Sequence, residues 1–192
     1  MEFFRYHNTN CFFIKSTINE KVLAIDAGWP CTFYEYARTI KTIGYGINQI
    51  AWAIVTHFHM DHAGLISEFL SKGIKCFVFE NQIDTIDQME KTILKNYKKY
   101  VRIKKEQLTY VKTIESRKIL REMGISGEVI ITTGHSPDSI SFISDSKEAV
   151  IGDLPPINQF VPDDNNCLMS WDLIKQKGVK TVYPSHAEIF DL

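Results

Sequence analysis

Short apolar runs and stretches with helical spacing divide the chain into elements of ordinary length. The runs Asn10–Ser16 and Lys21–Asp26 flank a polar turn and predict a pair of strands. The spacing over Phe33–Ile43 predicts a surface helix. Ile50–Thr56 is apolar and partly β-branched, which predicts a buried strand, and apolar residues in 62–72 have the spacing of a helix.

The second half of the chain continues this rhythm. A lysine-rich stretch at about 81–125 predicts a helical insertion, which includes a short helix over Ser116–Met123. Further predicted strands cover Lys75–Phe79, Glu128–Thr132, Ser139–Ser144, Ala149–Gly152 and Lys180–Tyr183, and a further helix covers Asn165–Lys177. Strands alternating with helices indicate an α/β or layered α+β fold with the helices outside. Because no repeat or linker interrupts the pattern, we expect a single domain over 1–192.

Composition narrows the class of protein. The chain has 192 residues, 44% of them hydrophobic and 23% charged, with a formal net charge of -1. This balance gives no general attraction to nucleic acid or to anionic membranes, so neither partner is expected. The start, Met1–Arg5, does not resemble a signal peptide and no apolar run could span a bilayer, so we expect a cytoplasmic protein. The four cysteines are far apart, which argues against a zinc knuckle or a disulfide framework.

The densest chemistry lies in residues 57–62, which read H-x-H-x-D-H. This stretch falls where a predicted strand ends and a predicted helix begins. Side chains at i and i+2 of an extended chain point the same way, so His57 and His59 can bind one ion together. Asp61 and His62 lie past the bend and can face a second point. The arrangement suits a pair of metal ions with nitrogen and oxygen ligands, which zinc, manganese and iron accept.

Other candidate residues follow other predicted strands. His135, Asp153 and His186 each come directly after an apolar run, and five of the six histidines in the chain occupy such positions. Ligands collected from several strand ends are typical of a site at one edge of a sheet. Asp26 also ends a strand, and it has two interpretations: a plain turn residue, or a carboxylate that orients a ligand histidine.

Three neighbours of these residues are candidate substrate contacts. Ser136, Tyr183 and Ser185 lie beside them in sequence, although such residues are more often turn formers. The basic stretch 91–105 also has two interpretations. It is either a solvated helical face, which we favour, or a lid that meets an anionic substrate.

In their order and content, these motifs resemble the metallo-β-lactamase superfamily of hydrolases. The resemblance rests on H-x-H-x-D-H at 57–62, TTGHSPDS around His135, IGDLP around Asp153 and YPSHAE around His186, and it covers nearly the whole chain. It implies an αβ/βα four-layer sandwich: two packed mixed β-sheets with helices on both outer faces.

The resemblance also implies a set of metal ligands. One ion would be held by His57, His59 and His135. The other would be held by Asp61, His62 and His186. Asp153 would bridge the two ions. The cofactors would then be two divalent ions, Zn²⁺ first, with Mn²⁺ or Fe²⁺ as alternatives.

The activity expected from this set is hydrolysis of an ester, thioester or lactone carbonyl in a small substrate. A hydroxide bridging two ions about 3.5–4 Å apart would attack, and Asp61 would also pass a proton to the leaving group. Zinc β-lactamases usually lack the histidine seen here at position 62 or have cysteine at the position of Asp153. Glyoxalase II thioesterases carry a C-terminal helical region that is not evident here. Small thioesterases and lactonases are therefore closest in layout.

Three further possibilities stay open at the level of sequence. A phosphodiesterase or nuclease of the same fold is the first alternative, since two metals also clamp a phosphate. A non-catalytic metal-binding sensor is the second. The aromatic run at residues 33–36 could serve a homodimer contact or a substrate wall.

Overall fold

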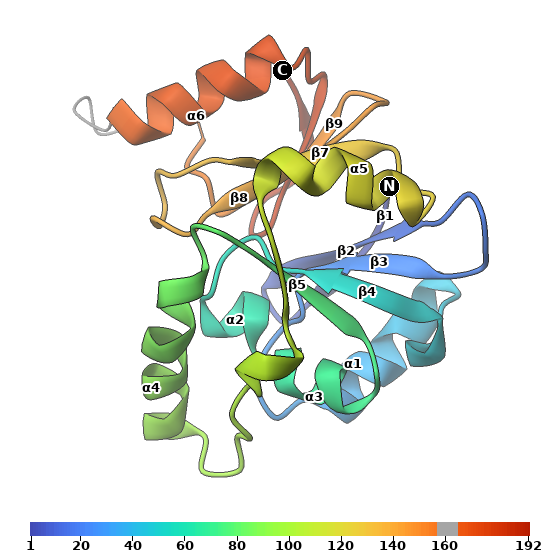
Figure 1. Ribbon diagram of the computed structural model, residues 1–192, viewed down its shortest axis with the longest axis vertical. Helices are drawn as coiled ribbons and strands as arrows, with labels where there is room; N and C mark the ends of the chain where they lie inside the picture. Colours follow the sequence, from blue (N-terminus) through green and yellow to red (C-terminus); the bar gives the residue numbers. More distant parts are fainter. Residues whose placement is uncertain (157–164) are drawn as a thin grey trace.

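The computed structural model describes residues 1–156 and 165–192 (Figure 1). Its strands are β1 Glu2–Tyr6, β2 Thr9–Lys15, β3 Val22–Ile25, β4 Ile50–Ile54, β5 Lys75–Phe79, β6 Thr109–Val111, β7 Gly127–Ile131, β8 Ile140–Ser144, β9 Glu148–Gly152, β10 Thr181–Pro184 and β11 Phe190–Asp191. Its α-helices are α1 Phe33–Thr39, α2 Met60–Ala63, α3 Ile66–Ser71, α4 Ile86–Asn96, α5 Ser116–Glu122 and α6 Asn165–Gln176.

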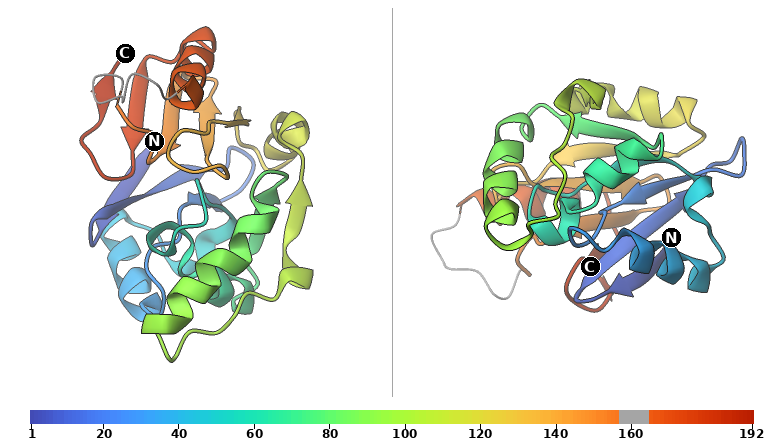
Figure 2. Two further views of the ribbon diagram at one scale, coloured as in Figure 1. Left: turned by 90° about the vertical axis from the view of Figure 1, so that its left-hand side faces the viewer. Right: turned by 90° about the horizontal axis from the view of Figure 1, so that it is seen from below.

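The strands form two mixed sheets. The first has the order β1-β2-β3-β4-β5-β6; its first three strands are antiparallel neighbours and β3 to β6 run parallel. The second has the order β11-β10-β9-β8-β7, with β9 and β10 parallel and the other neighbours antiparallel. Helices α1 and α3 cover the outer face of the first sheet and α6 covers the outer face of the second (Figures 1 and 2). This is the expected four-layer sandwich.

Alternation along the central strands explains why both faces of the first sheet are buried. In β3, Val22 and Ala24 contact the core under the helices, whereas Leu23 and Ile25 contact the core between the sheets. Side chains of a strand point alternately to its two faces, so a strand covered on both sides must be apolar throughout. A third core lies between the second sheet and α6, where Trp171 is 1% exposed.

The predicted elements are present, with three differences. The helix expected over 62–72 is broken into α2 and α3. The segment 81–125 contains a strand, β6, as well as helices, and β6 pairs parallel with β5. The terminal strands β1 and β11 were not predicted, because neither has a clear alternation of apolar and polar residues.

The break between α2 and α3 falls at Gly64, where two backbone segments touch. The amide of Gly64 donates to the carbonyl oxygen of Gly28 at 2.9 Å. A Cβ at position 64 would lie 2.3 Å from the backbone nitrogen of Pro30. Only glycine permits this approach, and it brings the end of α2 against the loop that follows β3.

The topology sends several chain segments to one edge of the sandwich. Parallel strands β3 and β4 end there, followed by Asp26 and by residues 57–62. In the second sheet β7, β9 and β10 run in the same direction, and their ends lead to His135, Asp153 and His186. Among the described residues, no helix has both the length and the apolar character needed to cross a membrane.

The aromatic run at the start of α1 supplies a test of the core. Tyr36 is fully buried among Phe4, Phe13 and Phe69, whereas Tyr34 is 90% exposed. Tyr36 is thus a core residue and not part of a substrate wall.

Tyr36→Ala should lower the free energy of unfolding by about 3–5 kcal/mol, because it leaves a cavity. Tyr34→Ala should change it by less than about 0.5 kcal/mol. Urea denaturation of both variants measures this difference, and equal losses would contradict the packing described.

Candidate metal centre

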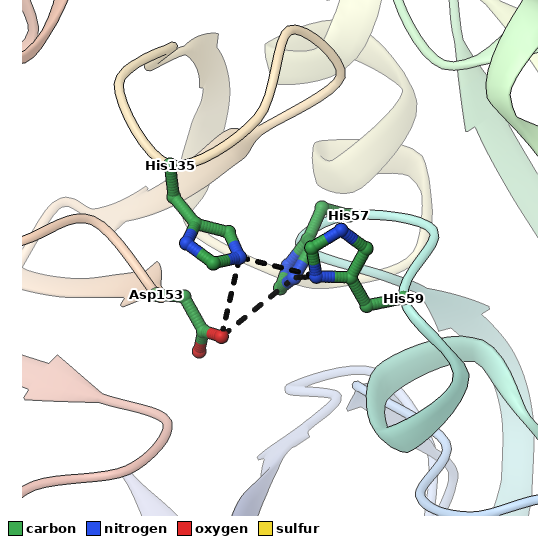
Figure 3. Close-up of side chains that lie close together, drawn as sticks. All are labelled: His57, His59, His135 and Asp153. Carbon is green, nitrogen blue, oxygen red and sulfur yellow. Dashed lines mark hydrogen bonds and ion pairs between the residues drawn. The ribbon is translucent and has the colours of Figure 1, made fainter. Parts of the chain in front are cut away.

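Three imidazole rings from two loops meet at the shared edge (Figure 3). His57 and His59 belong to the loop after β4, and His135 belongs to the loop after β7. His57 Nε2 lies 3.0 Å from His59 Nδ1, which lies 3.1 Å from His135 Nε2. The two i, i+2 histidines therefore do face one point, and the third comes from the other sheet.

A second group lies beside the first. It consists of Asp61 and His62 from α2 and His186 from the loop after β10. His62 Nε2 is 3.3 Å from His186 Nε2, and Asp61 Oδ2 is 3.2 Å from His186 Nε2 and 3.5 Å from His62 Nε2.

Asp153 lies between the two groups. Its Oδ2 is 3.7 Å from His57 Nε2 and 3.5 Å from His135 Nε2. The same oxygen is 3.3 Å from His186 Nε2, and Oδ1 is 3.4 Å from His62 Nε2. One carboxylate thus reaches donor atoms of both groups, as a bridging ligand must.

The spacing of these atoms fits metal ions. Donors held at about 2.0–2.1 Å from one ion lie roughly 3.0–3.4 Å from each other. The donor distances quoted above run from 3.0 to 3.7 Å, close to that spacing. The buried Oδ1 of Asp153 has no hydrogen-bond partner among the residues that the structure describes. A buried carboxylate oxygen without a partner is costly, and a cation between the groups would satisfy it. The residues present therefore fit a pair of divalent ions.

The charges at the centre also favour a cation. Burial alone would raise the pKa of Asp153, but the close contacts with the rings of His186 and His62 outweigh it and hold that pKa well below its ordinary range. Asp61 has the same balance of causes, and its pKa is also lowered. In return, the hydrogen bonds with Asp153 and Asp61 raise the pKa of His186 to about 10.

The first group behaves differently. Burial and the neighbouring charge of His62 lower the pKa of His57, and burial lowers the pKa of His135. These rings are neutral and ready to donate a lone pair. A metal binds only deprotonated nitrogen, so ions that enter the second group must displace protons there.

Hydrogen bonds on the far side of the rings decide which nitrogen faces the centre. The His186 Nδ1–H donates to the carbonyl oxygen of Asn8 at 2.7 Å, and the His62 Nδ1–H donates to Asp26 Oδ2 at 2.9 Å. Each bond leaves Nε2 free for a metal. Thr9 Oγ1 donates to Asp61 Oδ2 at 3.2 Å and fixes that carboxylate in turn.

Asp26 is the centre of a buried network. It is fully buried, and its Oδ1 accepts from the amide of Thr56 at 2.7 Å. Its Oδ2 accepts from His62 and, at 3.2 Å, from Ser185 Oγ. Asp26 therefore orients the ring of His62, one of the predicted ligands, and also connects the two sheets.

The three expected substrate contacts lie in different places. Ser136 lines a cavity beside His59 and Asp61. Ser185 is fully buried and donates to Asp26, so it supports the ligands and does not face the cavity. The Tyr183 hydroxyl donates to Glu148 Oε1 at 2.7 Å, and its ring packs in the core between the sheets, so it too lies away from that cavity.

The sequence did not reveal the residues that orient the predicted ligands through hydrogen bonds across long separations in the chain. Asn8 and Thr9 contact residues far away in sequence, and no local pattern indicates that they would. Asp138 is different, because it stands inside the quoted TTGHSPDS motif. Its Oδ2 accepts from the amide of Phe58 at 2.6 Å and so fixes the loop between His57 and His59.

Loss of the Asp26 carboxylate should weaken metal binding. In Asp26→Asn the backbone at φ 69° stays favourable, since asparagine tolerates that region, but the anion that orients His62 is gone. We expect zinc affinity to fall about 10- to 100-fold, measured by competition with a chromogenic chelator. Asp172→Asn, an exposed change on α6, should leave the affinity unaltered. Equal affinities for both variants, with native circular dichroism spectra, would contradict the role given to Asp26.

Comparisons with known proteins bear on the family to which the chain belongs. The sequence profile of the metallo-beta-lactamase superfamily matches residues 5–186. A search of curated proteins by sequence found no match. Among solved structures, the metallo-beta-lactamase family protein TTHA1429 from Thermus thermophilus is similar at 16% identity and TM-score 0.69, over 95% of this chain and 70% of that one.

Two more solved structures have the same fold. TTHA1623, in a di-iron-bound form, is 16% identical with TM-score 0.72, over 100% of this chain and 94% of that one. The archaeal superfamily protein ST1585 from Sulfolobus tokodaii is 17% identical with TM-score 0.62, over 96% of this chain and 76% of that one. At such low identity these likenesses show the fold alone. Because the profile match spans nearly the whole chain, however, the chain belongs to the metallo-β-lactamase superfamily.

Proposed function

We propose that this protein is a hydrolase that uses two divalent metal ions to hydrolyse a small ester, thioester or lactone, with attack at the carbonyl carbon and cleavage of its bond to the leaving oxygen or sulfur. One observation carries the proposal. Seven donor side chains form two adjacent groups, and Asp153 reaches donor atoms of both. A structural zinc site needs only four ligands, so this larger shared set favours catalysis over the alternative of a metal-binding sensor.

The types of donor atom restrict which metal ions the site would accept. His57, His59 and Asp153 would hold one ion together with His135, and the other group would hold the second. Five imidazoles and two carboxylates suit Zn²⁺, and they also accept Mn²⁺ or Fe²⁺. TTHA1623, which was solved in a di-iron-bound form, supports keeping iron among the candidates. Two divalent ions held by these seven side chains would polarise a carbonyl oxygen and would lower the pKa of water.

Asp61 is the side chain placed to handle a proton. Its Oδ2 faces His62 and His186, and Asp61 also lines the cavity beside the candidate metal centre. Hydrogen bonds with His186 and His62 keep this carboxyl ionised despite its burial. An ionised carboxylate that reaches both the centre and the cavity can take a proton from the nucleophile and pass it to the leaving group.

The adjoining cavity favours a carbonyl substrate over a phosphodiester. Among the described residues, no lysine or arginine lines it. No lysine of 91–105 is among the described lining residues, which supports the interpretation of that stretch as a solvated helical face, and Lys105 pairs with Asp87 at 2.7 Å. A site that bound phosphate would be expected to have positively charged side chains beside the metal ions.

Metal-dependent turnover is the direct test of the proposal. Zinc-loaded protein should hydrolyse at least one of a thioester and an acyl lactone, and a chelator should abolish the rate. Adding Zn²⁺, Mn²⁺ or Fe²⁺ back should restore it. The assay includes a β-lactam and a phosphodiester under the same conditions. Turnover of the phosphodiester alone, or a carbonyl rate that survives metal removal, would contradict the proposal.

Substitution of Asp61 tests its proposed role in proton transfer. Asp61→Asn keeps an oxygen ligand of the same size but removes the base, so kcat should fall by about 10²-fold or more. Metal content by mass spectrometry and the thermal unfolding midpoint check that the centre and fold persist. Asp172→Asn serves as the matched control and should retain full activity. A kcat near that of the unsubstituted protein, with both metals bound, would rule Asp61 out of proton transfer.

A further inference from the structure

A cavity of about 460 Å³ opens directly beside the metal ligands. Three segments form its walls: the ligand loop at 58–61, the loop at 136–138, and α4 with the residue before it. Its size is that of a pocket for a small molecule. In Figure 1, α4 stands beside α2, which carries Asp61 and His62.

One stripe of the α4 segment faces the cavity. It consists of Thr85, Gln88, Met89 and Thr92, which follow the spacing i, i+3, i+4, i+7 of a single helix face. A second face is buried in the core under the first sheet, where Ile86 and Ile93 are fully covered. Helix α4 thus supports the core with one side and forms a cavity wall with another.

Apart from the predicted ligand His59, the described residues of the cavity wall are neutral or acidic. Phe58, Met60, Met89 and Pro137 give it apolar surface, and the hydroxyls and the amide of α4 give it neutral polar surface. Its carboxylates are those of Asp61 and Asp138. No lysine or arginine is among the described lining residues, so an anionic group at the end of the cavity away from the predicted metal ligands would enter without a positively charged partner.

The wall is also fixed in place relative to the metal ligands. Asp138 is 2% exposed, and its Oδ2 accepts from the Phe58 amide at 2.6 Å and from Thr85 Oγ1 at 3.1 Å. Gln82 Nε2 donates to the carbonyl oxygens of Val55 at 2.9 Å and of Asp138 at 3.3 Å. These buried bonds tie the start of α4 to the loop that carries His57 and His59, so the cavity is preformed.

From the position of the cavity beside the predicted ligands, its size, its lining and its fixed walls, we infer that it is an acyl-binding subsite for an uncharged, predominantly apolar acyl group. The inference rests on the proposed function, because it takes the cavity to hold the part of the substrate next to the reacting carbonyl. It also assigns the substrate class: neutral aliphatic or aromatic acyl thioesters, esters or lactones, and not acyl groups that end in a carboxylate or a phosphate.

Methionine methyl groups provide a test that does not depend on catalysis. Of the five methionines, Met60 and Met89 line the cavity, whereas Met123 lies in the core between the sheets and Met169 is 70% exposed on α6. Zinc-loaded protein with labelled methionine methyls is titrated by NMR with isocaproamide and with succinamate. These probes have similar shapes and differ in whether the far end is neutral or anionic.

Isocaproamide should shift the methyl signals of Met60 and Met89 and leave those of Met123 and Met169 in place. Succinamate should shift neither pair at the same concentration. If isocaproamide leaves the cavity methyls unmoved, or if succinamate moves them equally, the subsite is refuted.

Kinetics with two thioesters then test the link to function. The ratio of kcat/KM for isocaproyl over succinyl thioester should be roughly tenfold or more, since the succinyl carboxylate finds no partner in the cavity. Gln88→Lys places a cation at the exposed side of the wall. It should reduce that ratio by about three- to fivefold, the size of one exposed ion pair.

Leu94→Lys is the matched control. It adds the same charge to α4 two residues beyond Thr92, on the opposite side of the helix, and should leave the ratio unchanged. Equal ratios in all three proteins, or a preference for the succinyl thioester in the unsubstituted protein, would overturn the assignment. If the methyl signals respond to isocaproamide but no thioester is hydrolysed, the binding site stands and the proposed activity fails.

Discussion

The hydrogen bonds of one buried carboxylate hold the site together. Asp26 follows β3 and accepts from the Thr56 amide after β4, from the His62 ring and from the Ser185 hydroxyl after β10. A buried carboxylate is stable only when its oxygens are well satisfied, and here the partners come from both sheets. The same bonds that satisfy Asp26 therefore bring the strand ends together and turn His62 toward the candidate metal centre.

Much of this could be predicted from sequence because the ligands are local to strand ends. H-x-H-x-D-H at 57–62 combines an extended segment with the start of a helix, so its geometry follows from backbone periodicity alone. His135, Asp153 and His186 follow strands that run in one direction, and the fold gathers such ends at one edge. The layered architecture followed from the alternation of strands with helices and, more specifically, from the resemblance to a known family.

The features of the site and the fold that were not predicted depend on contacts between residues far apart in the sequence, which no local pattern records. The Asn8 carbonyl oxygen accepts from His186, which is 178 residues away, and any residue could supply that oxygen. Ser185 is next to a ligand in sequence yet points into the buried network, because one residue of offset in an extended segment reverses the side chain. Strand β6 is only three residues long and is defined by its pairing with β5. The neutral stripe on α4 was likewise hidden among lysines that lie on another face.

The central claim is that the two groups of side chains bind two ions which share Asp153. Crystals grown with zinc, measured with anomalous scattering at the zinc absorption edge, test it most directly. We expect two peaks about 3.5–4 Å apart, one by His57, His59 and His135 and one by Asp61, His62 and His186, with Asp153 in contact with both. A single peak, or two peaks with Asp153 bound to neither or to only one, would rule out a shared two-metal centre.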